Sequence, residues 1–158
     1  MFKKILLATD GSENAFHAAK TAINVAQSTQ NATIYIVYVI EFSNAKTDIL
    51  QNWNSNELDK QRQEKIQSTV ELIKASGINY RTRFLRGEPG SALVKYANEG
   101  YFDLVIVGNG RKNKLQELLV GSVSHKVAKG ATSPVMIVKA QEFNKSRNVS
   151  AYFSAKSQ

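Results

Sequence analysis

The stretch TIYIVYVI, residues 33–40, decides the fold class of this chain. Every residue after the first is apolar or aromatic, and most are of the β-branched or aromatic types that favour strands. A strand with one face in water alternates apolar and polar residues, whereas a strand inside a parallel sheet is covered on both faces and reads as a continuous apolar run. The stretch therefore predicts an interior strand of a parallel sheet.

Strand and helix patterns alternate on both sides of this stretch. The predicted strands cover residues 2–9, 33–40, 78–85, 103–107 and 135–138, and the predicted helices cover residues 13–28, 55–76, 91–99 and 122–130. Such alternation is typical of an α/β fold with a parallel sheet and right-handed crossovers. The chain is therefore predicted to form a single doubly wound domain, with helices on both faces of a five-stranded sheet.

Short polar residues mark the ends of the predicted helices. The apolar face of the first helix is predicted to consist of Phe16, Ala19, Ile23 and Ala26. Either Asp10 or Ser12 is placed to cap this helix, and Asn54 with Glu57 forms a capping-box pattern before the second. Gly77 is placed to end the second helix in a left-handed conformation.

The composition limits the classes of protein that the chain can represent. Its 158 residues, 42% of them apolar, suffice for one domain with a core. No apolar run spans a bilayer, and the run at residues 5–8 is too short for a signal peptide, so a cytoplasmic protein without membrane contact is expected. The chain has no cysteine and two histidines, so no metal site is predicted. The net charge of +8 favours anionic partners, although a basic pI without functional meaning stays open.

The end of the chain differs in composition from the rest. Residues 1–140 contain all the predicted strands and helices and are expected to form the folded domain. Residues 141–158 are polar and rich in small side chains, with only Phe143, Tyr152 and Phe153 as aromatic residues. This composition predicts a tail that is poorly ordered, or ordered only by a partner.

A glycine-rich stretch with basic residues, VGNGRKNKLQELLVGSVSHKVAKG, covers residues 107–130. Doubly wound sheets bind ligands beyond the carboxyl ends of their strands. If the first and fourth strands are neighbours, the turn after Thr9 lies beside Gly108. Gly108 and Gly110 then let the backbone approach a phosphate, while Gly121 and Ser122 begin a helix whose free N–H groups attract an anion. The stretch indicates a phosphate site, to which Arg111, Lys112 and Lys114 add positive charge.

Structural interpretations of the same residues stay open. The glycines also fit two ordinary turns, because a loose glycine pattern is a weak signal. Asp10 can accept hydrogen bonds from a ribose or an adenine edge, but it can equally cap the first helix. The Ser122 hydroxyl can donate to a phosphate, or cap its own helix when no ligand is bound.

Two blocks of sequence resemble the universal stress protein family. They are KILLATDGSENA near the start and VGNGRKNKLQELLVGSVSHKVAKGATSPVMIVK near the end, and the resemblance extends over most of residues 1–139. It implies a Rossmann-like sheet of order 3-2-1-4-5 and a homodimer formed through the last strand, residues 135–139. It also implies that some members bind ATP without vigorous catalysis. The nucleotide contacts implied for this chain are Thr9, Asp10, Val39, Gly108, Gly110, Arg111, Gly121, Ser122 and Val123.

One position departs from the motif of the ATP-binding members. That motif is Gly-x-x-Gly, nine residues, then Gly-Ser or Gly-Thr, and counting back from Gly121 places its second glycine at position 111. This chain has Arg111 there and Gly110 just before it. Arg111 either crowds the phosphates, or pairs with one of them while Gly110 absorbs the bend. Binding is expected to be retained but weakened.

Several other residues give weaker signals. A catalytic role for His17 is disfavoured, and packing or solvent contact is favoured for His125 over phosphate contact. Trp53 either covers a ligand or partner, or packs locally. Glu41 and Glu88 follow strand ends and are weak candidates for binding magnesium, because neither is paired with a second carboxylate in sequence.

Together these features predict a universal stress protein that binds ATP, with or without Mg²⁺, as a homodimeric regulator that meets a further, unknown protein partner. The chain lacks a Ser-His-Asp set and the lysine of a P-loop, so no enzyme is predicted. The alternative is a dimeric interaction module in which Arg111 blocks the pocket. Nucleic-acid binding is disfavoured because the sequence shows no interleaved aromatic and basic platform.

Overall fold

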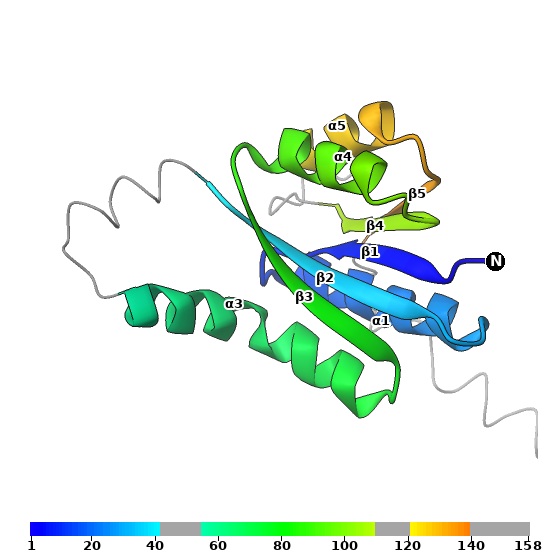
Figure 1. The fold of residues 1–158 in the computed structure, drawn as a ribbon, viewed down its shortest axis with the longest axis horizontal. Helices are drawn as coiled ribbons and strands as arrows, with labels where there is room; N and C mark the ends of the chain where they lie inside the picture. Colours follow the sequence, from blue (N-terminus) through cyan, green and yellow to red (C-terminus); the bar gives the residue numbers. More distant parts are fainter. Residues whose placement is uncertain (42–54, 110–120, 140–158) are drawn as a thin grey trace, which may run out of the picture.

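The computed structural model describes residues 1–41, 55–109 and 121–139, with the backbone alone for residues 55–59. This part of the chain contains a five-stranded parallel sheet of order β3-β2-β1-β4-β5 (Figure 1). Its strands are β1 (Lys4–Ala8), β2 (Thr33–Ile40), β3 (Asn79–Arg86), β4 (Leu104–Gly108) and β5 (Val135–Val138). The predicted order is confirmed, and β2 lies inside the sheet as its apolar run indicates.

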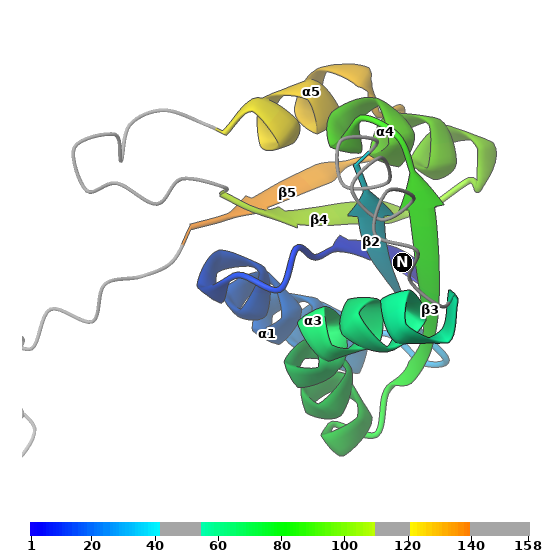
Figure 2. The same ribbon diagram turned by 90° about the vertical axis from the view of Figure 1, so that its left-hand side faces the viewer.

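Helices cover both faces of the sheet (Figure 2). On one face lie α1 (Glu13–Gln27) and α3 (Ser55–Ala75), and on the other lie α4 (Pro89–Glu99) and α5 (Ser122–Gly130). The predicted doubly wound fold is confirmed. No helix in the described ranges is long and apolar enough to cross a membrane.

The start of α4 lies two residues before the predicted start at residue 91. Pro89 opens the helix, because its fixed φ suits the first turn and its missing N–H has no intrahelical partner there. The Glu88 side chain caps the helix by accepting hydrogen bonds from the N–H groups of Gly90 (3.0 Å) and Ser91 (2.8 Å). In sequence, the glycines and the proline of this segment indicate only a turn.

Small residues form the buried face of α1. Ala19, Ile23 and Ala26 are buried as predicted, but Phe16 is only half-buried. The remaining buried positions of the helix are Ala15, Ala18 and Ala22. This alanine-rich stripe lets the helix backbone approach the sheet closely, and the bulky Phe16 lies beside it, 5.0 Å from the Lys20 ammonium.

Ser12, and not Asp10, caps α1. The Ser12 Oγ accepts a hydrogen bond from the N–H of Ala15 at 3.2 Å, and Asp10 instead accepts one from the N–H of Ser12 at 2.9 Å. The interpretation of Asp10 as the helix cap is therefore wrong. Gly77 has a φ of +74°, which confirms its predicted left-handed role, whereas the Asn54 and Glu57 side chains lie outside the described residues.

Gly11 forms the turn that joins β1 to α1. It has a φ of +77°, and a Cβ at this position would overlap the backbone carbonyl of Lys65 in α3. Both the backbone conformation and the packing of α3 against this turn therefore require glycine.

We expect Gly11→Ala to destabilise the protein more than Gly77→Ala. Gly77 also has a positive φ, but a Cβ at that position would meet nothing within 4 Å, so its replacement costs only the strain of that φ, about 1–2 kcal/mol. Gly11→Ala adds the overlap with Lys65, for about 1–3 kcal/mol more. Urea unfolding of the two variants measures the difference, and equal losses would contradict the packing argument.

Candidate functional site

A cavity of about 240 Å³ opens at the carboxyl ends of β1, β2 and β4. It lies where the strand order reverses, since β1 is flanked by β2 on one side and by β4 on the other. The starts of α1, α4 and α5 complete its walls. This is the position at which doubly wound proteins bind ligands.

The predicted site residues that fall in the described ranges all line this cavity. They are Thr9, Asp10, Val39, Gly108, Gly121, Ser122 and Val123. The remaining two, Gly110 and Arg111, lie outside the described residues, as do Lys112 and Lys114. The structure thus brings together residues from the end of β1, the end of β2, the end of β4 and the start of α5.

The packing of the protein itself requires a glycine at position 108. A Cβ at this position would lie 2.8 Å from the backbone carbonyl carbon and oxygen of Asn14, and 3.1 Å from the backbone nitrogen of Ala15. Real Cβ atoms do not approach backbone so closely. The first turn of α1 therefore packs directly on the end of β4, a reason that the phosphate interpretation of Gly108 did not include.

Asn109 connects three elements near the cavity and was missed by the sequence analysis. It is buried, and its Oδ1 accepts a hydrogen bond from the N–H of Gly121 at 3.2 Å. Its backbone N–H donates to the carbonyl of Val138 at 2.8 Å, and its own carbonyl accepts from Asn14 Nδ2. Asn109 therefore holds the start of α5 to β4, α1 and β5. In sequence, an asparagine between two glycines simply looks like a turn residue.

The start of α5 faces the cavity without a side-chain cap. Its N-cap is Gly121, which has no side chain to cap the helix and whose own N–H donates to Asn109 Oδ1. Ser122 is exposed and does not cap the helix, so that predicted alternative is wrong. Ser124 is buried and donates from its Oγ to the Gly108 carbonyl at 3.0 Å, which anchors the helix. Within the described residues the helix thus starts without a side-chain cap, and N–H groups at such a helix start attract anions.

The cavity lining combines charged and apolar side chains. Asp10 and Glu41 are its charged side chains among the described residues, and its apolar residues include Val37, Val39, Pro89, Leu93 and Val107. Thr9 also lines the cavity and is buried, and its Oγ1 accepts from the N–H of Gly11 at 3.2 Å. In the described part of the lining, the attraction for an anion comes from helix N–H groups and not from a basic side chain.

Glu88 has a structural role that the sequence did not indicate. Besides capping α4, its carboxylate lies 2.8 Å from Lys126 Nζ on α5. This hydrogen bond, with the contributions of Ser91 and Gly90, lowers the pKa of Glu88 from 4.5 to about 2. The described ranges contain no cluster of acidic or histidine side chains that could hold a metal ion. The carboxylate of Glu88 already accepts hydrogen bonds from α4 and from Lys126 of α5.

Of the other weak candidates that the structure describes, Glu41 lines the cavity and the two histidines do not. His17 is partly buried on α1, 3.9 Å from Glu13, and His125 is exposed on α5. Neither lines the cavity, in agreement with the disfavoured catalytic and phosphate roles. Trp53 falls outside the described residues.

We expect Glu88 to titrate near pH 2, and Lys126→Met to raise its pKa. Because the folded-state pKa lies below 4.5, the pair stabilises the fold fully above pH 4.5 and loses this effect as the pH falls towards 2. The effect on stability is small, since about half of each side chain is exposed. A carbon-detected NMR titration of the Glu88 carboxyl measures this, and a midpoint of 4.5 in the unmodified chain would contradict the assignment.

The fold and the position of the cavity place the chain among doubly wound α/β proteins with a site at the strand switch point. The profile of the universal stress protein family matches residues 1–139. The chain belongs to the universal stress protein family.

Individual relatives agree with this assignment. The universal stress protein MJ0531 of Methanocaldococcus jannaschii is 33% identical over 142 residues, covering 88% of this chain and 83% of the relative. The solved structure of MJ0577, from the same organism, is 29% identical with a TM-score of 0.74, covering 89% of this chain and 98% of that one.

Two more distant solved structures share the fold and hold nucleotides. One is a universal stress protein in complex with cAMP, 24% identical with a TM-score of 0.65, covering 87% of this chain and 97% of that one. The other is an Arabidopsis thaliana protein of the family with AMP bound, 17% identical with a TM-score of 0.65, covering 92% and 97%.

Proposed function

We propose that this chain is a cytoplasmic, homodimeric regulator of the stress response that binds an adenine nucleotide, ATP above all, in the cavity at the ends of β1 and β4. The observation that carries this proposal is the start of α5, which has no side-chain cap among the described residues and lines the same cavity as Asp10 and Val39. The cAMP and AMP held by two relatives of the same fold support an adenine nucleotide as the ligand.

In the proposed complex, different residues of the cavity lining hold the phosphates, the ribose and the adenine ring. The phosphates lie at the start of α5, near Gly121, Ser122 and Val123, where free N–H groups and the helix dipole favour negative charge. The Asp10 carboxylate accepts hydrogen bonds from the ribose hydroxyls. The adenine ring lies along the apolar residues of the lining near Val39, whose backbone supplies its hydrogen bonds.

The proposed role is binding rather than turnover. Gly121 is followed by Ser122 and not by the lysine that a P-loop places against its phosphates. Any Mg²⁺ would arrive with ATP, and Asp10 and Glu41 are the described carboxylates in the lining. Regulation requires that the nucleotide bind two states of the protein, or of its complexes, with different affinities.

β5 supports the homodimer part of the proposal. It is an edge strand whose residues are all half-buried, so its outer backbone groups are open to pairing with a second copy. Asn109 joins this strand to the cavity through the hydrogen bond from its N–H to Val138. We propose that residues 1–140 form the domain that dimerises and that residues 141–158 act as a separate tail.

We expect Ser122→Glu to weaken ATP binding at least about tenfold without destabilising the fold. A carboxylate at the first position of α5 interacts favourably with the helix dipole but repels phosphates from the same N–H groups. Isothermal titration calorimetry with ATP measures the affinity, and Ser122→Ala is the matched control, because it removes only the hydroxyl. Equal ATP affinity in the glutamate and alanine variants would contradict the phosphate position.

Calorimetric titration of the Arg111→Gly variant with ATP distinguishes the nucleotide-binding proposal from the alternative of an interaction module whose pocket Arg111 blocks. If Arg111 blocks the pocket, the unmodified chain does not bind ATP and the glycine variant does. If Arg111 pairs with a phosphate, the glycine variant binds ATP less tightly than the unmodified chain. Failure of both proteins to bind ATP would overturn the proposed nucleotide function.

A further inference from the structure

The outer edge of β3 carries backbone groups that no described strand pairs with. β3 pairs with β2 along its whole length of eight residues, and no described strand pairs with its other side. Because the N–H of Gly87 donates to Ile40 of β2 at 3.0 Å, strand alternation turns the N–H and C=O groups of Tyr80, Thr82 and Phe84 away from β2. The guanidinium of Arg83 reaches the outward carbonyl of Thr82 at 3.1 Å. This edge can therefore accept another strand.

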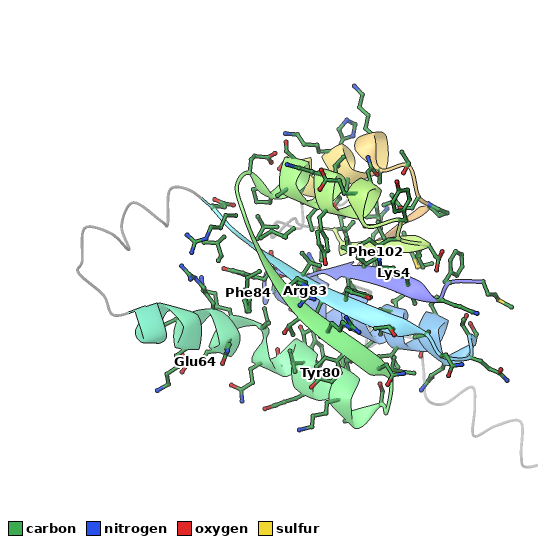
Figure 3. The ribbon with its side chains drawn as sticks, in the orientation of Figure 1. Lys4, Glu64, Tyr80, Arg83, Phe84 and Phe102 are labelled. Carbon is green, nitrogen blue, oxygen red and sulfur yellow. The ribbon has the colours of Figure 1, made fainter. Side chains whose placement is uncertain are left out.

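An apolar groove runs beside this edge, between β3 and α3. It has a volume of about 500 Å³ and is lined by Lys60, Gln63, Glu64, Ile66, Gln67, Val70, Tyr80, Thr82 and Phe84. Phe84 is 38% exposed, and its ring lies edge-on to Tyr38 with centroids 6.1 Å apart. Figure 3 shows Tyr80 and Phe84 on β3 and Glu64 on the neighbouring α3. The groove offers apolar surface to every second side chain of an added strand.

The opposite face of β3 is basic. Arg81 and Arg83 are exposed on the side of α4, and the Arg81 guanidinium lies 5.9 Å from the ring centroid of Tyr35. No acidic side chain of the described residues forms an ion pair with either arginine. Each arginine has a rigid fork of donors that matches a carboxylate. An added strand would therefore place its intervening side chains beside unpaired positive charge.

We propose that the outer edge of β3 binds an extended acidic segment of another protein, in which carboxylate and apolar side chains alternate. The backbone of the segment pairs with Tyr80, Thr82 and Phe84, its apolar side chains enter the groove beside α3, and its carboxylates face Arg81 and Arg83. This surface is separate from the cavity at the ends of β1 and β4 and does not depend on nucleotide binding.

Charge argues against a second copy of this chain as the occupant. The chain has a net charge of +8, and pairing two β3 edges would bring Arg81 and Arg83 of both copies together. Charged edge strands resist pairing with their own kind. The same arginines attract an acidic strand, and the groove on the opposite face of β3 adds apolar surface that a merely protected edge lacks.

The test uses the full chain and a labelled probe peptide with blocked ends, Glu-Val-Glu-Val-Glu-Val-Glu, measured by fluorescence anisotropy. A peptide of the same composition with its valines in one block is the control, because it has equal charge but cannot alternate its two faces. We expect the alternating peptide to bind at least about tenfold more tightly than the block peptide. Equal binding of the two, or no binding at about 1 mM peptide, would overturn the proposal.

Variants of β3 locate the peptide on the protein. Thr82→Pro removes an outward N–H without removing a hydrogen bond to β2, and we expect it to weaken binding at least about tenfold, whereas Thr82→Val keeps that N–H and the affinity. Replacing Arg81 and Arg83 together by glutamate has the same expected effect, and replacing both by lysine preserves most of the affinity. Thermal unfolding checks that each variant is folded.

A competition with ATP separates this surface from the nucleotide cavity. We expect excess ATP to leave the peptide bound, since the two surfaces involve different residues. Displacement of the peptide by ATP, or unchanged affinity in both Thr82→Pro and the double glutamate variant, would place the peptide elsewhere and overturn the proposal. If the chain does not bind ATP at all, the expected results of the peptide-binding experiments stay the same.

Discussion

The cavity depends on one close contact, the first turn of α1 against the end of β4. The backbone of Asn14 lies so near Gly108 that a Cβ there would be only 2.8 Å away. This contact brings the turn after β1, which carries Asp10, next to the end of β4. Asn109 then fixes the start of α5 through its hydrogen bond to Gly121. A side chain at position 108 would push the first turn of α1 away from the end of β4 and so change the shape of the cavity.

Helix capping differs among the three helices that begin at the cavity. Three helices begin at its walls, and Ser12 caps α1 while Glu88 caps α4, so the N–H groups of those two helices are partly satisfied within the protein. α5 begins at Gly121 with no cap from a described side chain. Under the proposed function, the phosphate oxygens of the nucleotide would accept hydrogen bonds from the N–H groups at the start of α5, as side chains do at the other two helices. The proposal therefore assigns the phosphates to this helix.

The sequence predicted what depends on local pattern and on general rules of the fold. The apolar run of β2 indicated an interior strand, and the strand order implied by the family resemblance put Asp10 and Gly108 at the ends of neighbouring strands. Choosing Ser12 over Asp10 as the cap needed side-chain geometry that a sequence does not contain.

The features that the sequence missed join residues far apart in the chain. Asn109 contacts Val138 and Gly121, and neither partner can be recognised from the Gly-Asn-Gly pattern. The groove at β3 depends on how α3 lies over Tyr80 and Phe84, which follows from its packing against α1. Tertiary packing, and not local propensity, decides such features.

The most direct measurement is an amide NMR titration of the full chain with ATP and, separately, with adenosine. The account predicts that ATP shifts the amide signals of Gly121, Ser122 and Val123 strongly, whereas adenosine shifts those near Val39 and leaves the start of α5 largely unchanged. If ATP left the amides at the start of α5 unmoved, or moved only signals remote from the cavity, the central claim would be contradicted.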